Sequence, residues 1–349
     1  MPMSTRKISF DDSLVPKVIE SRKCVSCGAC IVACPFNCLE YAEEKPNLIK
    51  ECKNCGICAK VCPRYEWSLS EAEELAFRRK RKPKEEYGVC HRLLIAQAKN
   101  KLVSKVCQDG GVVTALLLFA LETKIIDGAV VSEIDLKRPF YPIPKLATNA
   151  QDLLKAAGTR YSWSPNILAL YDVVNQKKNN VAFVGTPCHI RALRKIQITR
   201  LKKLTNPLKF FIGLMCSESF AYKELMENYI QKKLDINLRH IKKINIKGKM
   251  IVTTDTEVTT IPLKEVKQYA QASCHFCKDF SSELADISVG GLGLEGWTFI
   301  IIRSEKGEKL ISNAEKAGFI ITKPVEEGIY ALRLLKKLTL KKKSRSIHL

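Results

Sequence analysis

Apolar and polar positions along this chain follow two different periods, and these predict a body of mixed helices and strands. Short apolar runs bounded by turn residues are typical of buried strands, and they cover residues 125–134, 180–184, 208–214, 285–289 and 297–303. A helical period of apolar positions covers residues 112–124, 220–233 and 329–343. Because helix-like and strand-like stretches alternate, we expect an α/β (α+β) body over residues 89–349.

The part of the chain before this body divides at two points. Residues 1–66, called the head below, contain two similar runs of four cysteines each, an internal repeat that predicts a metal-binding domain. Residues 67–88 are expected to form a short helix that runs into a charged linker containing Pro83. Within the body, the glycine in Lys306-Gly307-Glu308 predicts a turn.

Hydropathy predicts a cytoplasmic protein. Apolar residues make up 46% of the chain, as is usual in soluble domains. The longest apolar stretch, residues 110–121, is much shorter than the roughly 20 residues that a membrane span requires. Residues 1–10 lack the apolar core of a signal peptide. We therefore expect any membrane contact to be peripheral, on the cytoplasmic face and through partner subunits.

The net charge of +22 is concentrated in the body and not in the head. Residues 191–249 are strongly basic, and residues 331–349 contain seven basic side chains and no acidic one. Such a surface suits an anionic ligand, an acidic partner or an anionic membrane, although a solvated lysine-rich face would give the same pattern. No nucleic-acid-binding motif accompanies the charge, so we expect no nucleic-acid partner.

Eight of the nine cysteines of the head have the spacing of bacterial two-cluster ferredoxins. Each half is a C-x2-C-x2-C-x3-C-P run, in which three close thiolates bind one cubane and the fourth reaches the other. Gly28 and Gly56 would let the backbone turn close to the sulfurs. Structural zinc usually uses separated CxxC pairs, which fits less well. The remaining Cys38, Cys90 and Cys107 are expected to be plain thiols. The predicted ligands are Cys24, Cys27, Cys30 and Cys62 for one 4Fe-4S cluster, and Cys52, Cys55, Cys58 and Cys34 for the other.

Four further cysteines lie in the body. Cys188 follows a strand and a glycine turn, Cys216 ends the next strand, and Cys274 and Cys277 form a CxxC. Together the four thiols could close a third metal site. Taken singly, a strand-end cysteine is usually a small apolar residue, and a CxxC could be either redox-active or structural.

Six segments of the body combine glycine turns, cysteines and polar residues in a specific order. They are residues 108–114, 158–160, 184–191, 213–218, 274–280 and 284–291. In this combination the body resembles the coenzyme F(420) hydrogenase/dehydrogenase beta-subunit family. The resemblance implies an α/β flavoprotein body behind an N-terminal two-cluster ferredoxin-like domain. It also implies that the body binds FAD and coenzyme F(420), and that its four cysteines hold a third 4Fe-4S cluster.

The same resemblance implies which residues contact FAD. Arg160 is a candidate for meeting a phosphate. His189 is the most versatile side chain near the flavin candidates, although it could equally be a structural histidine. No side chain is expected to act as a covalent catalyst. The candidate cofactor-binding residues are Gln108, Gly110, Gly111, Thr114, Thr159, Arg160, Gly185, Thr186, Pro187 and His189.

The function that the resemblance implies is that of an archaeal oxidoreductase. Reduced F(420) would give a hydride to FAD, and electrons would leave singly through the 4Fe-4S clusters to a membrane-bound, complex I-like partner. Two other functions stay open. The chain could be the beta subunit of another F(420)-linked enzyme, such as a formate dehydrogenase or a hydrogenase. It could also be a non-catalytic ferredoxin-type adaptor, without flavin.

Overall fold

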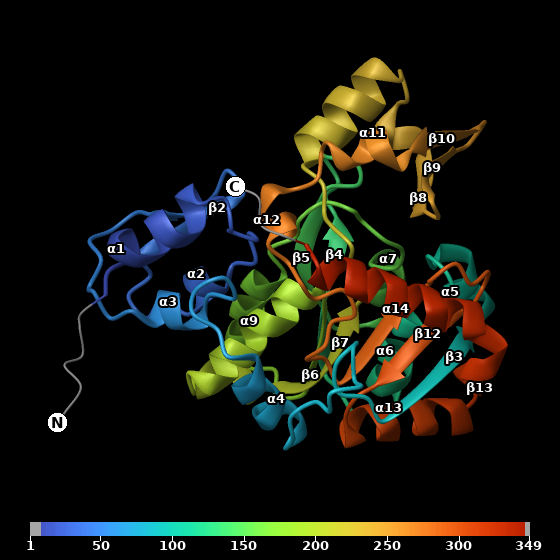
Figure 1. The fold of residues 1–349 in the computed structure, drawn as a ribbon, viewed down its shortest axis with the longest axis horizontal. Helices are drawn as coiled ribbons and strands as arrows, with labels where there is room; N and C mark the ends of the chain where they lie inside the picture. The colour runs from blue at the N-terminus through green and yellow to red at the C-terminus, as the bar shows by residue number, and fades with distance from the viewer. Residues whose placement is uncertain (1–7, 346–349) are drawn as a thin grey trace.

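An eight-stranded mixed sheet forms the centre of the computed structural model, which describes residues 8–345 (Figure 1). Its strands are β3 (Arg92–Ala98), β4 (Gly128–Ile134), β5 (Pro142–Ala147), β6 (Val181–Gly185), β7 (Leu208–Leu214), β11 (Ile287–Gly290), β12 (Thr298–Ile302) and β13 (Ile320–Pro324). Their order is β13-β3-β12-β11-β7-β6-β4-β5. Strands β11, β7, β6 and β4 are mutually parallel, whereas β12 and β5 pair antiparallel with β11 and β4.

The central strands are buried on both faces, which is why the sequence shows them as continuous apolar runs. All five residues of β6 and all five of β12 are buried. Along β6, Ala182 and Val184 face one apolar core, while Val181 and Phe183 face the other. The predicted α/β body is therefore confirmed.

Helices cover both faces of this sheet. One face is covered by α5 (Lys101–Val106), α6 (Val112–Glu122), α7 (Ala150–Lys155) and α13 (Glu305–Lys316). The other face carries α8 (Leu170–Asn175), α9 (Pro187–Ile198), α10 (Lys202–Thr205) and the 3-10 turn η2 (Asn166–Ala169), and at its far end η5 (Val325–Gly328) and α14 (Ile329–Lys343). Within residues 8–345, no helix is both long enough and apolar enough to cross a membrane.

The basic helix predicted near the C-terminus is confirmed as α14, and it belongs to the body. Ala331 and Leu335 are fully buried and pack in one cluster with Phe299 and Ile301 of β12. Most of its lysines therefore lie along the exposed side of the docked helix, whereas Lys342 in its last turn is buried.

A second, antiparallel sheet extends from the body and was not predicted. It consists of β8 (Ile241–Ile246), β9 (Lys249–Thr254) and β10 (Val258–Pro262), in the order β10-β9-β8, and appears in gold in Figure 1. Its core is shared with the helix predicted over 220–233, which is found as the π-helix η3 (Lys223–Lys233). The short helices α11 (Leu263–Lys267) and η4 (Leu238–His240) flank it.

The head is built from short helices and one hairpin. Its elements are α1 (Phe10–Leu14), η1 (Val15–Glu20), α2 (Ala29–Val32), β1 (Leu39–Ala42), β2 (Lys45–Leu48) and α3 (Ile57–Val61). It packs against α9, and α4 (Leu69–Phe77) follows beside it (Figure 1). Val25 and Val61 of the head share one apolar cluster with Ile167 and Ile190 of the body.

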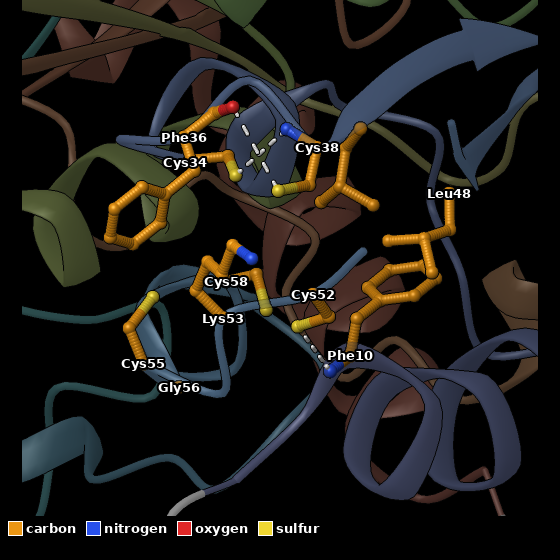
Figure 2. A pocket seen from close by; sticks show the side chains of 11 residues that line it. Phe10, Cys34, Phe36, Cys38, Leu48, Cys52, Lys53, Cys55, Gly56 and Cys58 are labelled. Atoms are coloured by element: carbon orange, nitrogen blue, oxygen red, sulfur yellow. Dashed lines mark hydrogen bonds between the residues drawn. The ribbon is translucent and has the colours of Figure 1, made fainter. Parts of the chain in front are cut away.

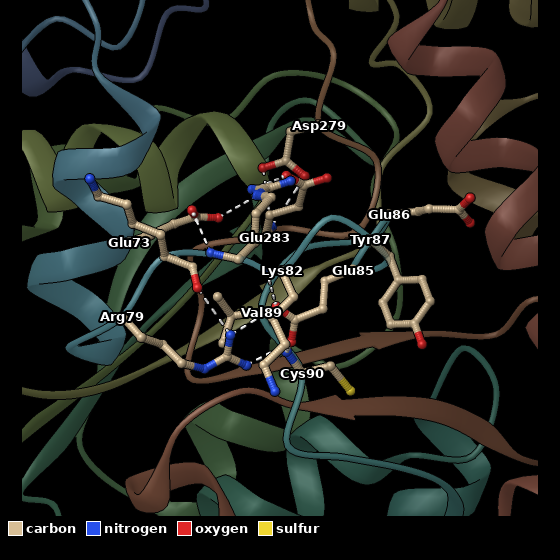
Figure 3. A network of polar contacts seen from close by, with 12 residues as sticks. Glu73, Arg79, Lys82, Glu85, Glu86, Tyr87, Val89, Cys90, Asp279 and Glu283 are labelled. Carbon is tan, nitrogen blue, oxygen red and sulfur yellow. Dashed lines mark hydrogen bonds and ion pairs between the residues drawn. The ribbon is translucent and has the colours of Figure 1, made fainter.

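The charged segment after α4 is held to the body by buried ion pairs. Arg81 pairs with Glu73 of α4 at 2.5 Å and with Glu283 of the body at 2.6 Å. Arg79 pairs with Glu85 at 2.6 Å. Figure 3 shows Glu73, Glu85 and Glu283 gathered in this network. Both Glu73 and Glu283 are almost completely buried, so the segment is fixed by charge pairing rather than being a free linker.

The turn predicted at residues 306–308 is wrong, because these residues form the first turn of α13. Ser304 caps this helix, and its hydroxyl accepts a hydrogen bond from the amide of Gly307 at 3.2 Å. Glu305 and Glu308 lie in the first turn of the helix, where their negative charges interact favourably with the positive end of the helix dipole. A Cβ on Gly307 would lie 2.5 Å from the carbonyl oxygen of Asp286, so the glycine is required by packing.

Candidate functional site

The two cysteine runs of the head fold in the same way. In each, a glycine with positive φ precedes a short helix: Gly28 (φ 83°) before α2 and Gly56 (φ 67°) before α3. Only glycine adopts this conformation without strain, which explains its place between the second and third cysteine. A Cβ on Gly28 would also lie 2.7 Å from the side chain of Leu168, where the body packs against the head.

The thiols of the head gather in the two predicted groups of four, with the fourth cysteine of each run crossing over. Burial raises the pKa of Cys27, and the nearby thiolates of Cys62 and Cys24 raise it further. Burial likewise raises the pKa of Cys58 to about 12, and the neighbouring thiols that act on it are Cys52, Cys55 and Cys34. Buried thiols with raised pKa values lose their protons readily only to a bound metal, so both groups fit a 4Fe-4S cubane.

The second group surrounds a small pocket in the head (Figure 2). Its walls include Phe10, Phe36 and Leu48, and the backbone amides of Phe10 and Cys38 point at sulfurs, at 3.4 Å from Cys52 and 3.3 Å from Cys34. Apolar walls and amide donors suit the sulfurs of an iron–sulfur cluster. Among residues 8–345, no three potential ligands converge on a point for one single metal ion.

The four body cysteines lie together where the parallel strands end. Cys188 is in the first turn of α9 directly after β6, and Cys216 comes two residues after β7. Cys274 lies in α12 (Ala272–His275), and Cys277 follows it. The carboxyl edge of a parallel sheet is the usual binding edge of such folds. The sequence-based grouping of these four residues therefore matches their placement.

The pKa of Cys277 is shifted in the opposite direction from the pKa values of the other body thiols. Burial raises the pKa of Cys274 to about 11, and of Cys216 still further. For Cys277, burial also acts upward, but the charges of Lys342 and Arg64 outweigh it and hold the pKa below its usual value. Among the four body thiols, Cys277 therefore most favours the thiolate, which is the form that binds iron.

The first head group and the body group adjoin one another. The charge of Cys188 is near enough to Cys27 to raise its pKa. A narrow crevice beside the body thiols is lined by Arg64, Cys188 and Cys277. The guanidinium of Arg64 donates to the carbonyl oxygens of Ser273 and Phe276, both at 3.1 Å. Head and CxxC segment are therefore joined directly.

The glycine turn at residues 108–111 lies between the large sheet and β8. The side-chain amide of Gln108 donates to the carbonyl oxygen of Ile244 at 3.1 Å, and Lys243 donates to the carbonyl oxygen of Gln108 at 2.6 Å. Gly111 has φ 71° and begins α6, in whose first turn Thr114 is buried. The amino end of α6 and the basic residues of β8 thus border one loop, which suits an anionic group.

Replacing Gly110 with alanine tests the tight packing of this turn. A Cβ would lie 2.7 Å from both the carbonyl oxygen of Ala96 and the amide nitrogen of Thr298, which are backbone atoms of β3 and β12. We expect Gly110→Ala to lower the free energy of unfolding by about 1–3 kcal/mol and to reduce the flavin content of the purified protein. Urea unfolding and flavin absorbance measure the two effects.

Gly248→Ala is the matched control for that substitution. Gly248 has φ 72° but nothing within 4 Å of an added Cβ, so only backbone strain of about 1–2 kcal/mol is expected. Full flavin content in both variants would contradict a role of the Gly110 turn in binding.

The side chain of Arg160 closes the end of α7. It donates to the carbonyl oxygens of Ala156 at 2.7 Å, Gly158 at 3.1 Å and Lys155 at 3.2 Å. Burial lowers its pKa to about 10, so it stays charged at neutral pH. A phosphate contact of Arg160, and a flavin contact of the half-buried Thr159 beside it, stay predictions.

The β6–α9 turn is organised around His189. Thr186 caps α9 ahead of Pro187, and Nδ1 of His189 accepts hydrogen bonds from the amide (3.3 Å) and hydroxyl (3.0 Å) of Thr186. Nε2 of His189 donates to the carbonyl oxygen of Ser164 at 2.8 Å. Burial lowers the histidine pKa to about 4, so the ring is neutral. Both nitrogens are engaged within the protein, which favours a structural role for His189. A Cβ on Gly185 would lie 2.8 Å from this side chain.

Sequence reasoning missed the charged residues that border the thiols. Lys342 is buried and donates to the carbonyl oxygen of Cys216 at 2.6 Å. Burial alone would lower its pKa, but the charges of Cys277 and Cys216 raise it overall. Lys195, also buried, donates to the carbonyl oxygen of Cys62 at 2.8 Å. Their only sequence signal was general basicity, and the spacing of lysines does not indicate which one turns inward.

Comparison with known proteins identifies relatives of both parts. Residues 17–40 match the 4Fe-4S binding domain family. Residues 93–171 match the N-terminal part, and residues 178–328 the C-terminal part, of the beta subunit of coenzyme F(420) hydrogenase/dehydrogenase.

Individual relatives give the same result. The beta subunit of coenzyme F(420) hydrogenase from Methanothermobacter thermautotrophicus is 38% identical over 264 residues, covering 74% of this chain and 93% of its own. A subunit of the F(420)H(2) dehydrogenase from Methanosarcina mazei is 36% identical over 205 residues, covering 58% of this chain and 57% of its own. A chain in the solved F(420)-reducing NiFe hydrogenase complex from Methanosarcina barkeri superposes with a TM-score of 0.72 at 36% identity, covering 76% of this chain and 92% of that one.

Proposed function

Since the chain belongs to the coenzyme F(420) hydrogenase/dehydrogenase beta-subunit family and carries a 4Fe-4S binding domain, we propose that it oxidises reduced coenzyme F(420) and passes the electrons on through iron–sulfur clusters. Its role would be that of the input subunit of an F(420)H(2) dehydrogenase, on the cytoplasmic side of a membrane-bound, complex I-like partner.

The observation that carries this proposal is the continuous arrangement of three thiol groups. The body cysteines adjoin the first head group through Cys188 and Cys27, and the second head group lies beyond it with Cys55 exposed. Phe36 and Ile49 of the head, near that second group, are about half exposed, at 49% and 50%. An apolar surface beside an outermost carrier suits contact with an acceptor protein.

The residues of the body would position the organic cofactors. FAD supplies the conversion of a hydride into single electrons when it is bound. The turn at 108–111 and the β6–α9 turn would bind it, and the basic residues Lys243 and Lys247 beside the first turn would favour an anionic cofactor. The buried, neutral His189 would keep the second turn in shape rather than exchange protons.

A role as a hydrogenase beta subunit is the second candidate. The hydrogenase relative matches 264 residues, which is 74% of this chain, at 38% identity. The head, with its two runs of four cysteines, would give this chain its own outlet for electrons, which supports the dehydrogenase role. A formate dehydrogenase beta subunit differs from both by its partner, and a ferredoxin-type adaptor would contain no flavin.

The proposal is tested by anaerobic purification followed by addition of reduced F(420). We expect bleaching of the flavin band and of the broad cluster absorbance, together with the appearance of oxidised F(420). Bleaching that then reverses on adding membranes with a quinone-type acceptor would support the dehydrogenase role. Hydrogen-dependent F(420) reduction by a co-purified nickel subunit would replace it with the hydrogenase role. A spectrum that does not respond at all to reduced F(420) would leave only an adaptor.

A further inference from the structure

The ammonium of Lys342 is a buried charge that the proposed function does not use. Lys342 lies in the last turn of α14 and is 3% exposed. Its Nζ donates to the backbone oxygen of Cys216 at 2.6 Å. Lysine is almost never fully buried unless a negative partner compensates its charge. Such a partner must therefore lie at the body thiols.

The end of α14 is fixed by the two charged residues that follow Lys342, which are Lys343 and Arg345. Lys343 pairs with the buried Glu283 at 3.1 Å. Arg345 donates to the carbonyl oxygen of Cys274 at 3.0 Å and contacts Glu218 at 3.5 Å. These contacts hold the ammonium of Lys342 against the thiol group, whereas the neighbouring Lys341 is exposed to solvent.

The other charges at the body thiols do not cancel this ammonium. The adjoining crevice is lined by Arg64 and Arg191 together with the acidic Asp279. Two further carboxylates lie nearby, but Glu283 is paired with Arg81 and Lys343, and Glu218 with Arg345. The set of Lys342, Arg64, Arg191 and Asp279 therefore keeps an excess of positive charge. An excess of buried positive charge is stable beside a strongly negative group.

We propose that Lys342 is a charge-compensating residue that sets the reduction potential of the body 4Fe-4S cluster, an inference that rests on the proposed function because it requires that cluster. A cubane with four thiolate ligands is net negative, and the one-electron step from its oxidised to its reduced form adds a further negative charge. A fixed ammonium in a buried site stabilises the more negative form more strongly. Lys342 would thus raise the potential and favour acceptance of the electron.

The test compares Lys342→Met with the unchanged full-length protein in an anaerobic redox titration followed by electron paramagnetic resonance. The body signal is identified as the one missing from the Cys274→Ser/Cys277→Ser double variant. We expect Lys342→Met to lower the midpoint potential of this signal by at least about 59 mV. For a one-electron step, this shift corresponds to a tenfold change in the ratio of oxidised to reduced cluster. The head signals serve as internal references.

Two further variants separate charge from packing. Lys342→Arg keeps the charge and should keep the potential, and Lys341→Met removes an exposed charge from the same turn and should change nothing measurable. Loss of the body cluster from Lys342→Met and Lys342→Gln, but not from Lys342→Arg, would also support the proposal, because only charge distinguishes these variants.

Two results would overturn the proposal in distinguishable ways. An unshifted potential in Lys342→Met with full iron content would remove the role of Lys342 and leave the proposed function intact. If the protein without any substitution contained iron for only two clusters, the third cluster would be refuted. The proposed function would then fail at that point, before any lysine variant is interpreted.

Discussion

Replacing Cys274 and Cys277 together with serine is expected to remove about four irons per chain, because both residues belong to one proposed cluster with four cysteine ligands. Cys274 is half-buried and accepts a hydrogen bond from the amide of Ser219 at 3.3 Å, and Cys277 has a lowered pKa. Without this cluster the head should no longer be reduced rapidly, although the flavin should still bleach with reduced F(420). Iron analysis and stopped-flow absorbance measure the two effects.

Cys90→Ser is the matched control for the double variant. Cys90 is a partly buried thiol next to the charged segment, and it has no place in any of the three cysteine groups. Its replacement should leave the iron content unchanged. Equal iron in the double variant and the unchanged protein would eliminate the body cluster, whereas equal loss from Cys90→Ser would point to general instability.

Replacing Arg303 with methionine is expected to lower the free energy of unfolding by about 3–5 kcal/mol. Arg303 follows β12 and is completely buried. It donates to Ser288 Oγ at 2.7 Å, to the carbonyl oxygen of Val89 at 2.7 Å and to that of Ser281 at 3.1 Å. Methionine fills much of the same space but leaves these acceptors without their donor, and it removes a positive charge from the neighbourhood of the buried Glu283.

Urea unfolding followed by circular dichroism measures this loss. Arg92→Met is the control, because Arg92 on β3 pairs with Glu308 at 2.7 Å between two largely solvated side chains. An exposed pair of this kind contributes roughly 0–1 kcal/mol. Similar losses in the two variants would show that burial of Arg303 does not determine its contribution.

The strands of the body could be predicted from the sequence where their burial requires a run of apolar residues. Strands β6 and β12 are buried on both faces and β7 is interrupted only by the exposed Lys209, so all three were visible as apolar runs. The sheet of β8, β9 and β10 was missed because apolar residues mix with lysines and threonines along its strands, so no continuous apolar run appears. This mixing occurs because only one side of the sheet is covered. The order of strands in the large sheet depends on contacts between distant segments and leaves no such pattern.

The candidate site was predicted where chemistry fixes the spacing. Three thiolates on one cubane require the C-x2-C-x2-C spacing, so the head cysteines were predicted as ligands from their spacing alone, and the structure brings the predicted neighbours together. The four body cysteines are far apart in sequence, and they were grouped through resemblance. Nothing local marked Arg64, Lys195 or Lys342, because a lysine or arginine that turns inward has the same neighbours in sequence as one that stays in water.

The apolar cluster that head and body share has a consequence for how electrons can move. Val25 and Ala29 of the head pack with Ile167 and Ile190 of the body, and all four are at most 5% exposed. Domains joined by small polar interfaces usually swing relative to one another, whereas a large apolar interface suppresses such motion. In the proposed path, the step from body to head would therefore be set by a fixed separation between carriers. Its rate should not be gated by a hinge, unlike that of shuttling carriers that must dock anew for each electron.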